Sequence, residues 1–246
     1  MTLKNSIVVA VPTYNERENV QKLYQEIKNL NLPIDFYFID DNSPDGTGDV
    51  LAKIAAHDSA VRVMHRSRKL GLGTAHIEAF RYARQRDYQY LITMDADFTH
   101  DPKYIPLLLS KKNDADIIIG SRYTSGGKMS GWGKIRLPFT LFWRWLIAKG
   151  LGMPFDCTGA FRLYRVAALD PNIFENLDSR GFSFCMESIY YFKKAGLKID
   201  EVPIHAQSRL HGKSKLSINI MAEAAKKFLS LFYDRLFKRS VYVQQR

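Results

Sequence analysis

Cysteine is scarce in this 246-residue chain, which contains only Cys157 and Cys185. Two cysteines do not suffice for the disulfide framework of a small secreted domain, and they lack the spacing of metal ligands, so we interpret both as small core residues. A run of about 18 apolar residues, the length that a membrane-spanning helix needs, is also absent. The apolar run Ile7–Val11 is shorter than the core of a secretory signal, which takes about 7 to 15 residues. We therefore expect a cytoplasmic protein that does not span the membrane.

Acidic residues are fewer than basic ones, with 25 Asp and Glu against 36 Lys and Arg and a formal net charge of +11. The excess is concentrated near the end of the chain, where residues 206–246 carry a net charge of +7 and the first 205 residues carry +4. This asymmetry predicts a negatively charged surface or substrate for the C-terminal part. We expect no nucleic-acid partner, because the acidic motifs described below would repel its phosphates.

Internal repeats, low-complexity tracts and Ser/Gly linkers are also missing, while 46% hydrophobic residues suffice for a real core. Short β-rich apolar runs alternate with helical patterns along the chain. This alternation predicts an α/β fold with a mostly parallel central sheet flanked by helices. The predicted strands include residues 7–11, 36–39, 61–65, 90–94 and 116–120, and the predicted helices include 20–30, 49–57, 74–86 and 105–110.

Carboxylates follow the predicted strands at the point where the strands end. Asp95 and Asp97 come directly after one apolar run, and Asp40 and Asp41 follow another. Open α/β sheets bind ligands at the carboxyl ends of their strands, and such carboxylates suit Mg2+ or Mn2+ bridging the phosphates of a nucleotide. Asp-rich segments after strands are often only turns or helix caps, as we expect for Asp101, so the pair alone is weak evidence.

Six polar motifs occur in order over about residues 7–215. They are Pro12-Thr-Tyr-Asn-Glu16, Asp40-Asp-Asn-Ser-Pro-Asp-Gly-Thr47, Asp95-Ala-Asp-Phe-Thr-His100, Gly120-Ser-Arg-Tyr123, Thr158-Gly-Ala-Phe-Arg162 and Arg209-Leu-His-Gly-Lys-Ser-Lys215. In this order the motifs resemble the dolichol-phosphate mannose synthase-like branch of the family 2 glycosyltransferases. The resemblance implies the GT-A fold.

The resemblance also implies roles for individual residues. The first two motifs and the Asp95–Asp97 motif would hold the nucleotide sugar and the metal, while four cations would handle the phosphates of donor and acceptor. Relatives can carry Gln where this chain has Thr99, and a hydroxyl is a shorter ligand than an amide. The implied catalytic residues are Asp97, Arg122, Arg136 and Arg209, the implied nucleotide-sugar-binding residues are Pro12, Tyr14, Glu16, Asp41, Asp95, Ala96 and Lys215, and the implied metal ligands are Asp95 and Asp97.

The expected chemistry depends on the acceptor that the resemblance implies, a polyprenyl or dolichyl phosphate. Such a phosphate is already an anion at neutral pH, so it can attack the anomeric carbon without a general base. Mg2+ or Mn2+ would stabilise charge on the leaving nucleoside diphosphate, and arginine forks would hold the phosphates. We therefore expect inverting transfer of a hexose, specifically mannose from GDP-mannose, to a polyprenyl phosphate. The alternative is a family 2 transferase that uses UDP-glucose or another nucleotide sugar, with a polysaccharide hydroxyl as acceptor.

Residues 217–246 are predicted to form a basic amphipathic segment after a GT-A domain at residues 1–216. Phe228, Leu229, Phe232 and Leu236 would insert shallowly into a membrane, and Lys227 with its basic neighbours would meet anionic headgroups. The alternative is a helix that packs on the core. We favour the membrane because the implied acceptor is a lipid.

A second segment suited to membrane contact contains Trp132, Trp143 and Trp145 with the nearby Arg136, Arg144 and Lys149, and its alternative is a packed aromatic helix. Together the two segments predict a peripheral protein on the cytoplasmic face of the membrane, with or without an integral-membrane partner. We also expect a flexible loop at Ser125–Gly133, which contains four glycines and would close over the substrates.

Two further polar residues are left open by the sequence. We interpret His76 as a structural or donor-site residue and not as a metal ligand. Glu187 is either a lone charge near the active site or the partner of a basic residue.

Overall fold

The structure is a computed structural model, and it describes residues 5–130, 136–175, 177–207 and 218–237. A seven-stranded sheet forms its centre, in the order β3-β2-β1-β4-β7-β5-β8. Only the fifth strand in this order runs antiparallel to its neighbours, which confirms the predicted mostly parallel sheet. The strands are β1 (Ile7–Thr13), β2 (Ile34–Asp40), β3 (Val61–His65), β4 (Tyr90–Thr93), β5 (Ile117–Ser121), β7 (Arg162–Arg165) and β8 (Ile199–Pro203).

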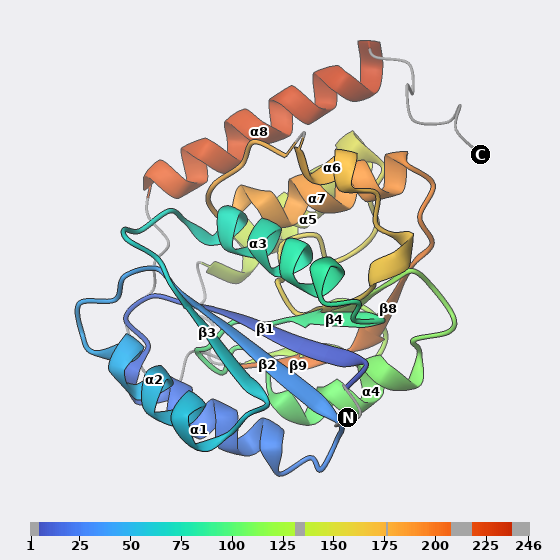
Figure 1. Ribbon diagram of the computed structural model, residues 1–246. Coiled ribbons are helices and arrows are strands. Elements are labelled where there is room, and N and C mark those ends of the chain that lie inside the picture. The colour runs from blue at the N-terminus through green and yellow to red at the C-terminus, as the bar shows by residue number, and fades with distance from the viewer. Residues whose placement is uncertain (1–4, 131–135, 176, 208–217, 238–246) are drawn as a thin grey trace.

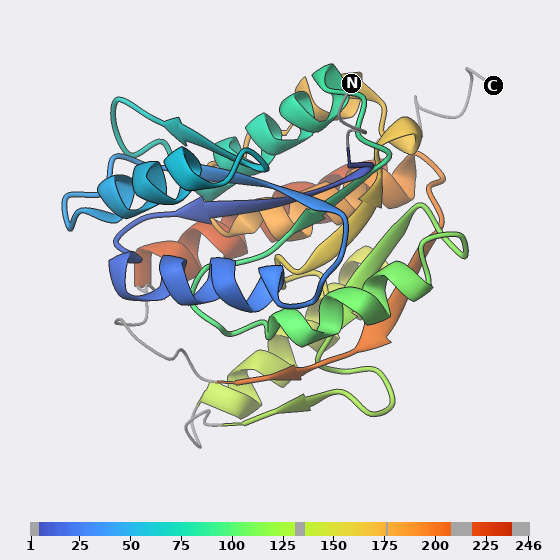
Figure 2. The same cartoon turned by 60° about the horizontal axis from the view of Figure 1, so that its bottom comes forward.

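Helices cover both faces of the sheet, and a hydrophobic core lies under each layer (Figure 1). Figure 2 shows α1 in blue and α4 in green on one side of the strands and α3 in teal on the other. One layer consists of α1 (Arg17–Lys28), α2 (Thr47–His57), the 3-10 helix η1 (Pro102–Tyr104) and α4 (Ile105–Ser110). The other consists of α3 (Leu72–Gln85), α5 (Arg136–Leu151), the 3-10 helix η2 (Val166–Ala168), α6 (Pro171–Glu175), α7 (Ser183–Lys194) and α8 (Ile218–Phe237).

The central strand β1 shows why its sequence is a continuous apolar run. Successive side chains of a strand point to opposite faces, so Val8 and Ala10 enter one core while Val9 and Val11 enter the other. All four side chains are fully buried. A strand covered on both faces needs apolar residues at every position, unlike a strand with one solvated face.

The strand order places the predicted acidic motifs together. Because β1 lies between β2 and β4 and runs parallel to both, the carboxyl ends of these three strands meet at one edge of the sheet. The chain leaves β1 in one direction towards β2 and later returns to its other side as β4. Such a reversal of strand order opens the crevice in which α/β sheets bind ligands.

Two predicted helix starts can be compared with the structure. Asp101 caps η1 as predicted, because its Oδ1 accepts a hydrogen bond from the Lys103 N–H at 3.0 Å. Helix α3 begins at Leu72, two residues before the predicted start at residue 74. Gly73 lies so close to the chain that an added Cβ would be 2.1 Å from the carbonyl oxygen of Ser179. The first turn of α3 can therefore approach residue 179 only if glycine occupies this position.

The C-terminal helix α8 packs against α5 and α7. Phe228 and Leu231 are buried, and the Phe228 ring lies 5.6 Å from the Trp143 ring of α5. The predicted membrane insertion of Phe228 is therefore wrong, because this side chain belongs to the core. The division between residues 216 and 217 stays a prediction. Among the residues that the structure describes, no helix has the length and apolar character needed to cross a membrane.

A separate two-stranded sheet pairs β6 (Lys128–Met129) in parallel with β9 (His205–Ala206). β6 lies within the predicted loop Ser125–Gly133, of which residues 131–133 fall outside the described part of the chain. The predicted flexibility of this loop stays a prediction.

Candidate active site

A cavity of about 270 Å3 opens where β1, β2 and β4 end. All six residues of the first half of the chain that the resemblance assigns to the nucleotide sugar line it: Pro12, Tyr14, Glu16, Asp41, Asp95 and Ala96. The sheet edge thus brings together segments that are up to about 80 residues apart in sequence. This cavity is the candidate donor site.

The Asp41 carboxylate anchors the segment that leads into α3. Its Oδ1 accepts hydrogen bonds from the Arg66 guanidinium at 2.9 Å and from the Leu70 N–H at 3.1 Å, and its Oδ2 accepts one from the Gly71 N–H at 2.8 Å. The Arg66 and Asp41 side chains are only 5% and 9% exposed. Asp41 therefore shapes the wall of the cavity through these contacts, and its role in nucleotide binding stays a prediction.

Lys69 is a cavity residue that the sequence analysis did not identify. Its ammonium lies 3.8 Å from the centre of the Tyr14 ring, and both residues line the donor cavity. A lysine beside the site adds a positive charge where the phosphates of a nucleotide would lie. No sequence motif marks Lys69, because its position depends on the fold of the loop between β3 and α3.

Asp95 and Asp97 line both this cavity and a second, larger one. Asp97 is buried, and its Oδ1 accepts hydrogen bonds from the backbone N–H and the hydroxyl of Thr99, at 3.1 and 2.6 Å. The Thr99 side chain thus orients the carboxylate. The two carboxylates lie where the cavities meet, which is the position at which a donor and an acceptor would come together.

The pair of carboxylates at this junction fits a hard divalent cation whose remaining ligands come from elsewhere. Among the described residues, no group of three or more His, Cys, Asp and Glu side chains is arranged to hold a metal. Two aspartates are nevertheless sufficient for Mg2+ or Mn2+, because such ions commonly take one or two carboxylates and complete their shell with phosphate oxygens and water. Asp95 and Asp97 are the residues that would hold it.

The second cavity has a volume of about 470 Å3 and is the candidate acceptor site. Its walls combine a few polar groups with many apolar ones, contributed by α5, α7, α8 and the segment before β7. The residues that line it include Arg122, Tyr123, Thr140, Trp143, Arg144, Ile147, Phe155, Thr158, Phe182, Met186 and Met221.

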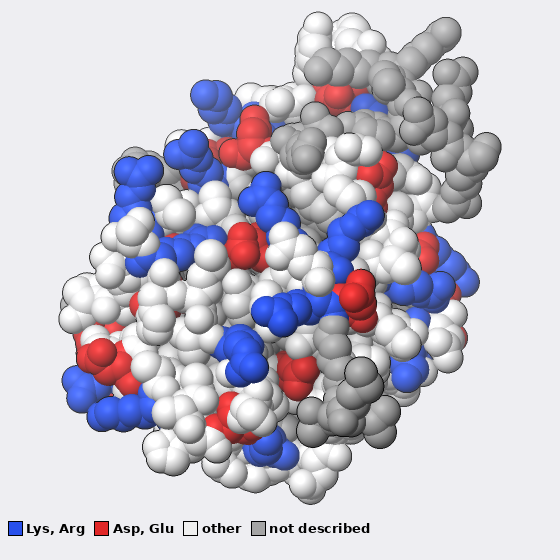
Figure 3. Space-filling model, in the orientation of Figure 1, with Lys and Arg blue, Asp and Glu red and all other residues white. Residues whose placement is uncertain are grey.

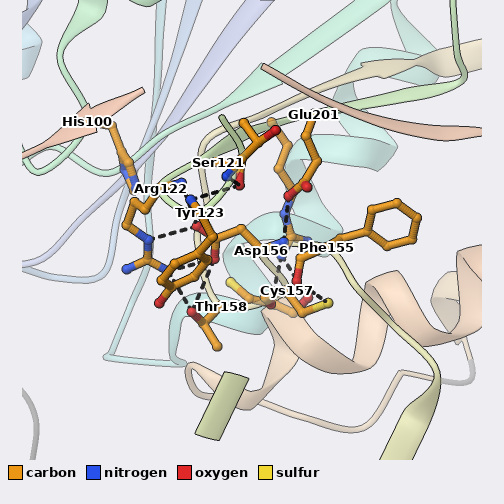
Figure 4. Close-up of polar contacts among 12 residues, drawn as sticks. His100, Ser121, Arg122, Tyr123, Phe155, Asp156, Cys157, Thr158 and Glu201 are labelled. Atoms are coloured by element: carbon orange, nitrogen blue, oxygen red, sulfur yellow. Dashed lines mark hydrogen bonds and ion pairs between the residues drawn. The ribbon is translucent and has the colours of Figure 1, made fainter. Parts of the chain in front are cut away.

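Arg122 and Asp156 form a buried bidentate ion pair in the wall of the acceptor cavity (Figure 4). Arg122 Nε donates to Asp156 Oδ2 at 2.8 Å, and Nη2 donates to Oδ1 at 2.6 Å. Arg122 also donates to the Thr158 hydroxyl at 2.6 Å. The predicted phosphate-binding residue Arg122 thus does face the cavity, but Asp156 already neutralises its charge.

The pKa values of the pair reflect this environment. Burial by itself would lower the pKa of the Arg122 guanidinium, but the Asp156 carboxylate outweighs burial and raises it. Burial would likewise raise the pKa of Asp156, but the charge and hydrogen bonds of Arg122 hold it below its usual range. The neighbouring Glu201 carboxylate accepts the Asp156 N–H at 2.7 Å, and burial raises the pKa of Glu201. Both members of the pair are therefore charged at neutral pH.

His100 lies beside Asp95 and is held neutral. Burial, with a smaller effect of the Arg122 charge, lowers the pKa of His100 to about 4. Its Nδ1 is 3.8 Å from Asp95 Oδ2, and its ring stacks on Phe161 with ring centres 5.6 Å apart. A histidine with this pKa is a weak base at pH 7.

Three predicted cationic residues lie partly or wholly outside the described part of the structure. Arg136 begins α5, but its side chain is not described. Arg209 and Lys215 are outside the described residues altogether. Their roles stay predictions.

The structure shows the surroundings of the two cysteines and of Glu187. Cys157 and Cys185 are buried and free, as predicted for core residues, and burial raises the pKa of Cys185 to about 11. Glu187 is buried and accepts hydrogen bonds from Lys227 at 2.9 Å and from the Ser179 N–H at 3.0 Å, so it is the partner of a basic residue. Lys227 is consequently not available to anionic headgroups, contrary to the prediction.

Fold and site together define a glycosyltransferase of the GT-A type. The chain belongs to glycosyl transferase family 2, whose sequence profile matches residues 8–171. The undecaprenyl-phosphate mannosyltransferase of Micrococcus luteus is 37% identical to it over 222 residues, which are 89% of this chain and 90% of the relative. The polyprenol monophosphomannose synthase of Mycolicibacterium smegmatis is 35% identical over 223 residues, which are 88% and 83% of the two chains.

Solved structures agree with this fold. The mannosyltransferase PcManGT from Pyrobaculum calidifontis, in complex with GDP-Man and Mn2+, superposes with a TM-score of 0.59 at 14% identity, covering 97% of this chain. TarS from S. aureus in complex with UDP-GlcNAc also gives a TM-score of 0.59, at 18% identity and covering 93% of this chain. In both cases the match spans 66% of the other chain, just under two thirds of its length. At these identities the likeness concerns the fold.

Proposed function

We propose that the chain catalyses the metal-dependent, inverting transfer of mannose from GDP-mannose to a polyprenyl phosphate. The names of the two sequence relatives support the sugar and the acceptor class. The observation that carries the proposal is the arrangement of the two cavities, which meet at Asp95 and Asp97. A donor in the first cavity would present its anomeric carbon to an acceptor in the second, and a single displacement would invert the configuration.

The residues of the site suit an acceptor that needs no deprotonation. Arg122 is paired with Asp156, and neither member of this pair is a free base. A phosphate acceptor attacks as an anion, whereas a sugar hydroxyl would need a base. When bound by Asp95 and Asp97, Mg2+ or Mn2+ would neutralise charge on the leaving diphosphate. The largely apolar lining of the acceptor cavity would help to keep water from the donor once an acceptor fills it.

The outer surfaces of α5 and α8 support contact with a membrane. Six large apolar side chains on these helices are between 45% and 67% exposed. Exposed apolar surface of this extent on neighbouring helices is typical of an interaction site. We propose that this surface lies on the cytoplasmic leaflet; an integral-membrane partner stays a prediction. The six residues are Leu141, Phe142, Trp145, Leu229, Leu236 and Phe237.

A panel of donors and acceptors tests the proposed function. GDP-mannose and UDP-glucose are each incubated with polyprenyl phosphate, with the corresponding polyprenol and with an oligosaccharide, and the lipid or sugar product is identified by mass spectrometry. We expect a mannosylated lipid phosphate from GDP-mannose and polyprenyl phosphate, with the β-anomer formed from the α-linked donor. Transfer from UDP-glucose, or to a hydroxyl acceptor, would instead support the alternative within the family.

A further inference from the structure

Helix α5 presents two different faces. Thr140, Trp143, Arg144 and Ile147 line the acceptor cavity, and their spacing of three and four residues places them on one side of the helix. The exposed apolar residues Leu141, Phe142 and Trp145 lie on other sides. The predicted membrane contact is therefore wrong for Trp143 and Arg144, because both line the cavity. Trp145 is exposed and stays a candidate for that contact.

Arg144 is the remaining cation in the wall of this cavity. Its guanidinium lies 4.5 Å from the centre of the Tyr123 ring, and the guanidinium of Arg122 lies 5.2 Å from the same ring. Arg122 is neutralised by Asp156, whereas Arg144 forms no salt bridge with a described carboxylate, although its charge acts on the Glu201 carboxylate and tends to lower the pKa of Glu201. Its Nε is buried without a hydrogen-bond partner there.

A half-buried arginine whose Nε is buried without a partner points to an anion in this cavity. Burying even one donor without a partner is unfavourable, and a guanidinium has further N–H donors to offer to the same ligand. Contact with Tyr123 stabilises the positive charge but satisfies none of these donors. A phosphate oxygen would accept from them in the geometry that arginine favours.

We infer that Arg144 binds the phosphate of the polyprenyl phosphate acceptor. The inference rests on the proposed function, which supplies the phosphate. It adds Arg144 to the three arginines that the resemblance implies, Arg122, Arg136 and Arg209. The position of Arg144 also fits a lipid, because the same helix turns apolar side chains outwards while Arg144 faces the cavity.

The test compares lipid binding with and without the phosphate group. Farnesyl phosphate and farnesol are titrated into the full chain, and the variants are Arg144→Ala, Arg144→Lys and, as a control, Lys149→Ala. Lys149 is exposed near the C-terminal end of α5 and does not line either cavity, so its removal takes away a charge of the same helix without touching the site. GDP affinity in the presence of Mg2+ is measured for each variant as a check on the donor site.

We expect the wild-type chain to bind farnesyl phosphate more tightly than farnesol, and Arg144→Ala to lose about 10- to 100-fold of that preference. Farnesol and GDP affinities should change less than about threefold. Arg144→Lys should recover part of the preference, because a point charge does not replace the planar fork. Guanidinium ion added to Arg144→Ala should recover part of it as well, and Lys149→Ala should match the wild type.

The outcomes separate this inference from the proposed function. If Arg144→Ala keeps the preference for the phosphate, or loses affinity for farnesyl phosphate, farnesol and GDP equally, Arg144 is a packing residue and the inference is wrong. If the wild type shows the preference and Arg144→Ala loses it, but no lipid phosphate is mannosylated, the inference holds and the proposed reaction is wrong.

Discussion

Two buried histidines are held in their neutral form. Burial lowers the pKa of His76 to about 3, and that of His100 to about 4. The His76 ring stacks on Phe184, with ring centres 5.3 Å apart, and neither of its ring nitrogens has a hydrogen-bond partner among the described residues. His76 is thus a structural residue, one of the two roles that the sequence left open.

His76 should make the protein less stable in mild acid. Its folded pKa lies below the unfolded value of 6.5, so the unfolded chain takes up the proton first. The free energy of unfolding is therefore fully maintained above pH 6.5 and falls as the pH decreases towards 3. At pH 5 the loss is about 2 kcal/mol for each such histidine. We expect His76→Phe to lose about 2 kcal/mol less stability than the wild type between pH 7.5 and pH 5, measured by urea unfolding. An equal loss in both proteins would show that His76 is not kept neutral.

The Arg122–Asp156 pair should matter more for activity than for stability. Removing only the acid, in Asp156→Ala, leaves a buried guanidinium without its partner and should cost about 3–5 kcal/mol of unfolding free energy. Replacing both residues, in Arg122→Met with Asp156→Leu, should restore most of this stability, because apolar groups of similar volume often pack as well. We expect the double variant to fold but to transfer sugar at least about 100-fold more slowly. Near wild-type transfer by the double variant would show that the pair only supports the fold.

Helix α8 illustrates how far the sequence predicted an element. Its helical period and approximate bounds follow from the spacing of apolar residues, and the structure places the helix at Ile218–Phe237. The buried face could not be assigned, because Phe228 and Leu229 are both apolar and only packing against α5 and α7 distinguishes them. Lys227 was misassigned for the same reason, since its partner Glu187 lies 40 residues earlier in the sequence.

The exposed apolar faces of α5 and α8 lead us to predict that these residues contribute to membrane binding. Leu229→Ser with Leu236→Ser should reduce sedimentation with anionic vesicles several-fold, because the hydrophobic effect scales with the apolar area that is buried. Phe228→Leu, which alters a buried neighbour, serves as the matched control and should bind vesicles like the wild type. Unchanged vesicle binding by the double variant, with GDP affinity retained, would place the membrane contact elsewhere.

At the scale of the whole molecule, the meeting of the acidic motifs was predictable and the lining of the second cavity was not. The motifs that contain Asp41 and Asp97 follow strands, and the carboxyl ends of neighbouring parallel strands lie at one edge of a sheet, so their proximity follows from the sequence. The acceptor cavity is built from α5, α7 and α8, and no local pattern reveals that Asp156 neutralises Arg122 or that Arg144 faces inwards. The net charge was also a poor guide to the surface, since on the face shown in Figure 3 basic side chains are interspersed with acidic ones.

The junction of the two cavities predicts metal dependence. Chelator should abolish transfer, and Mg2+ or Mn2+ should restore it. Asp97→Asn keeps a carbonyl oxygen for the Thr99 contacts but removes the charge, so we expect a folded variant with turnover reduced by about 10²–10³. Thermal unfolding of the variant near the wild-type temperature confirms the fold. Full activity of the wild type in chelator would contradict a role for a metal.

The diameter of α5 sets the distance between the acceptor cavity and the exposed apolar surface of the molecule. One helix with its side chains is about 10–12 Å across, and here it separates the acceptor cavity from the exposed apolar face. If that face rests on a bilayer, only the first isoprene units of the acceptor have to leave the lipid, while the rest of the tail stays among the acyl chains. The enzyme would then recognise only the phosphate and the first isoprene units of its acceptor. Transfer rates should therefore rise with chain length only until the tail spans one helix diameter, and longer polyprenyl phosphates should be used equally well.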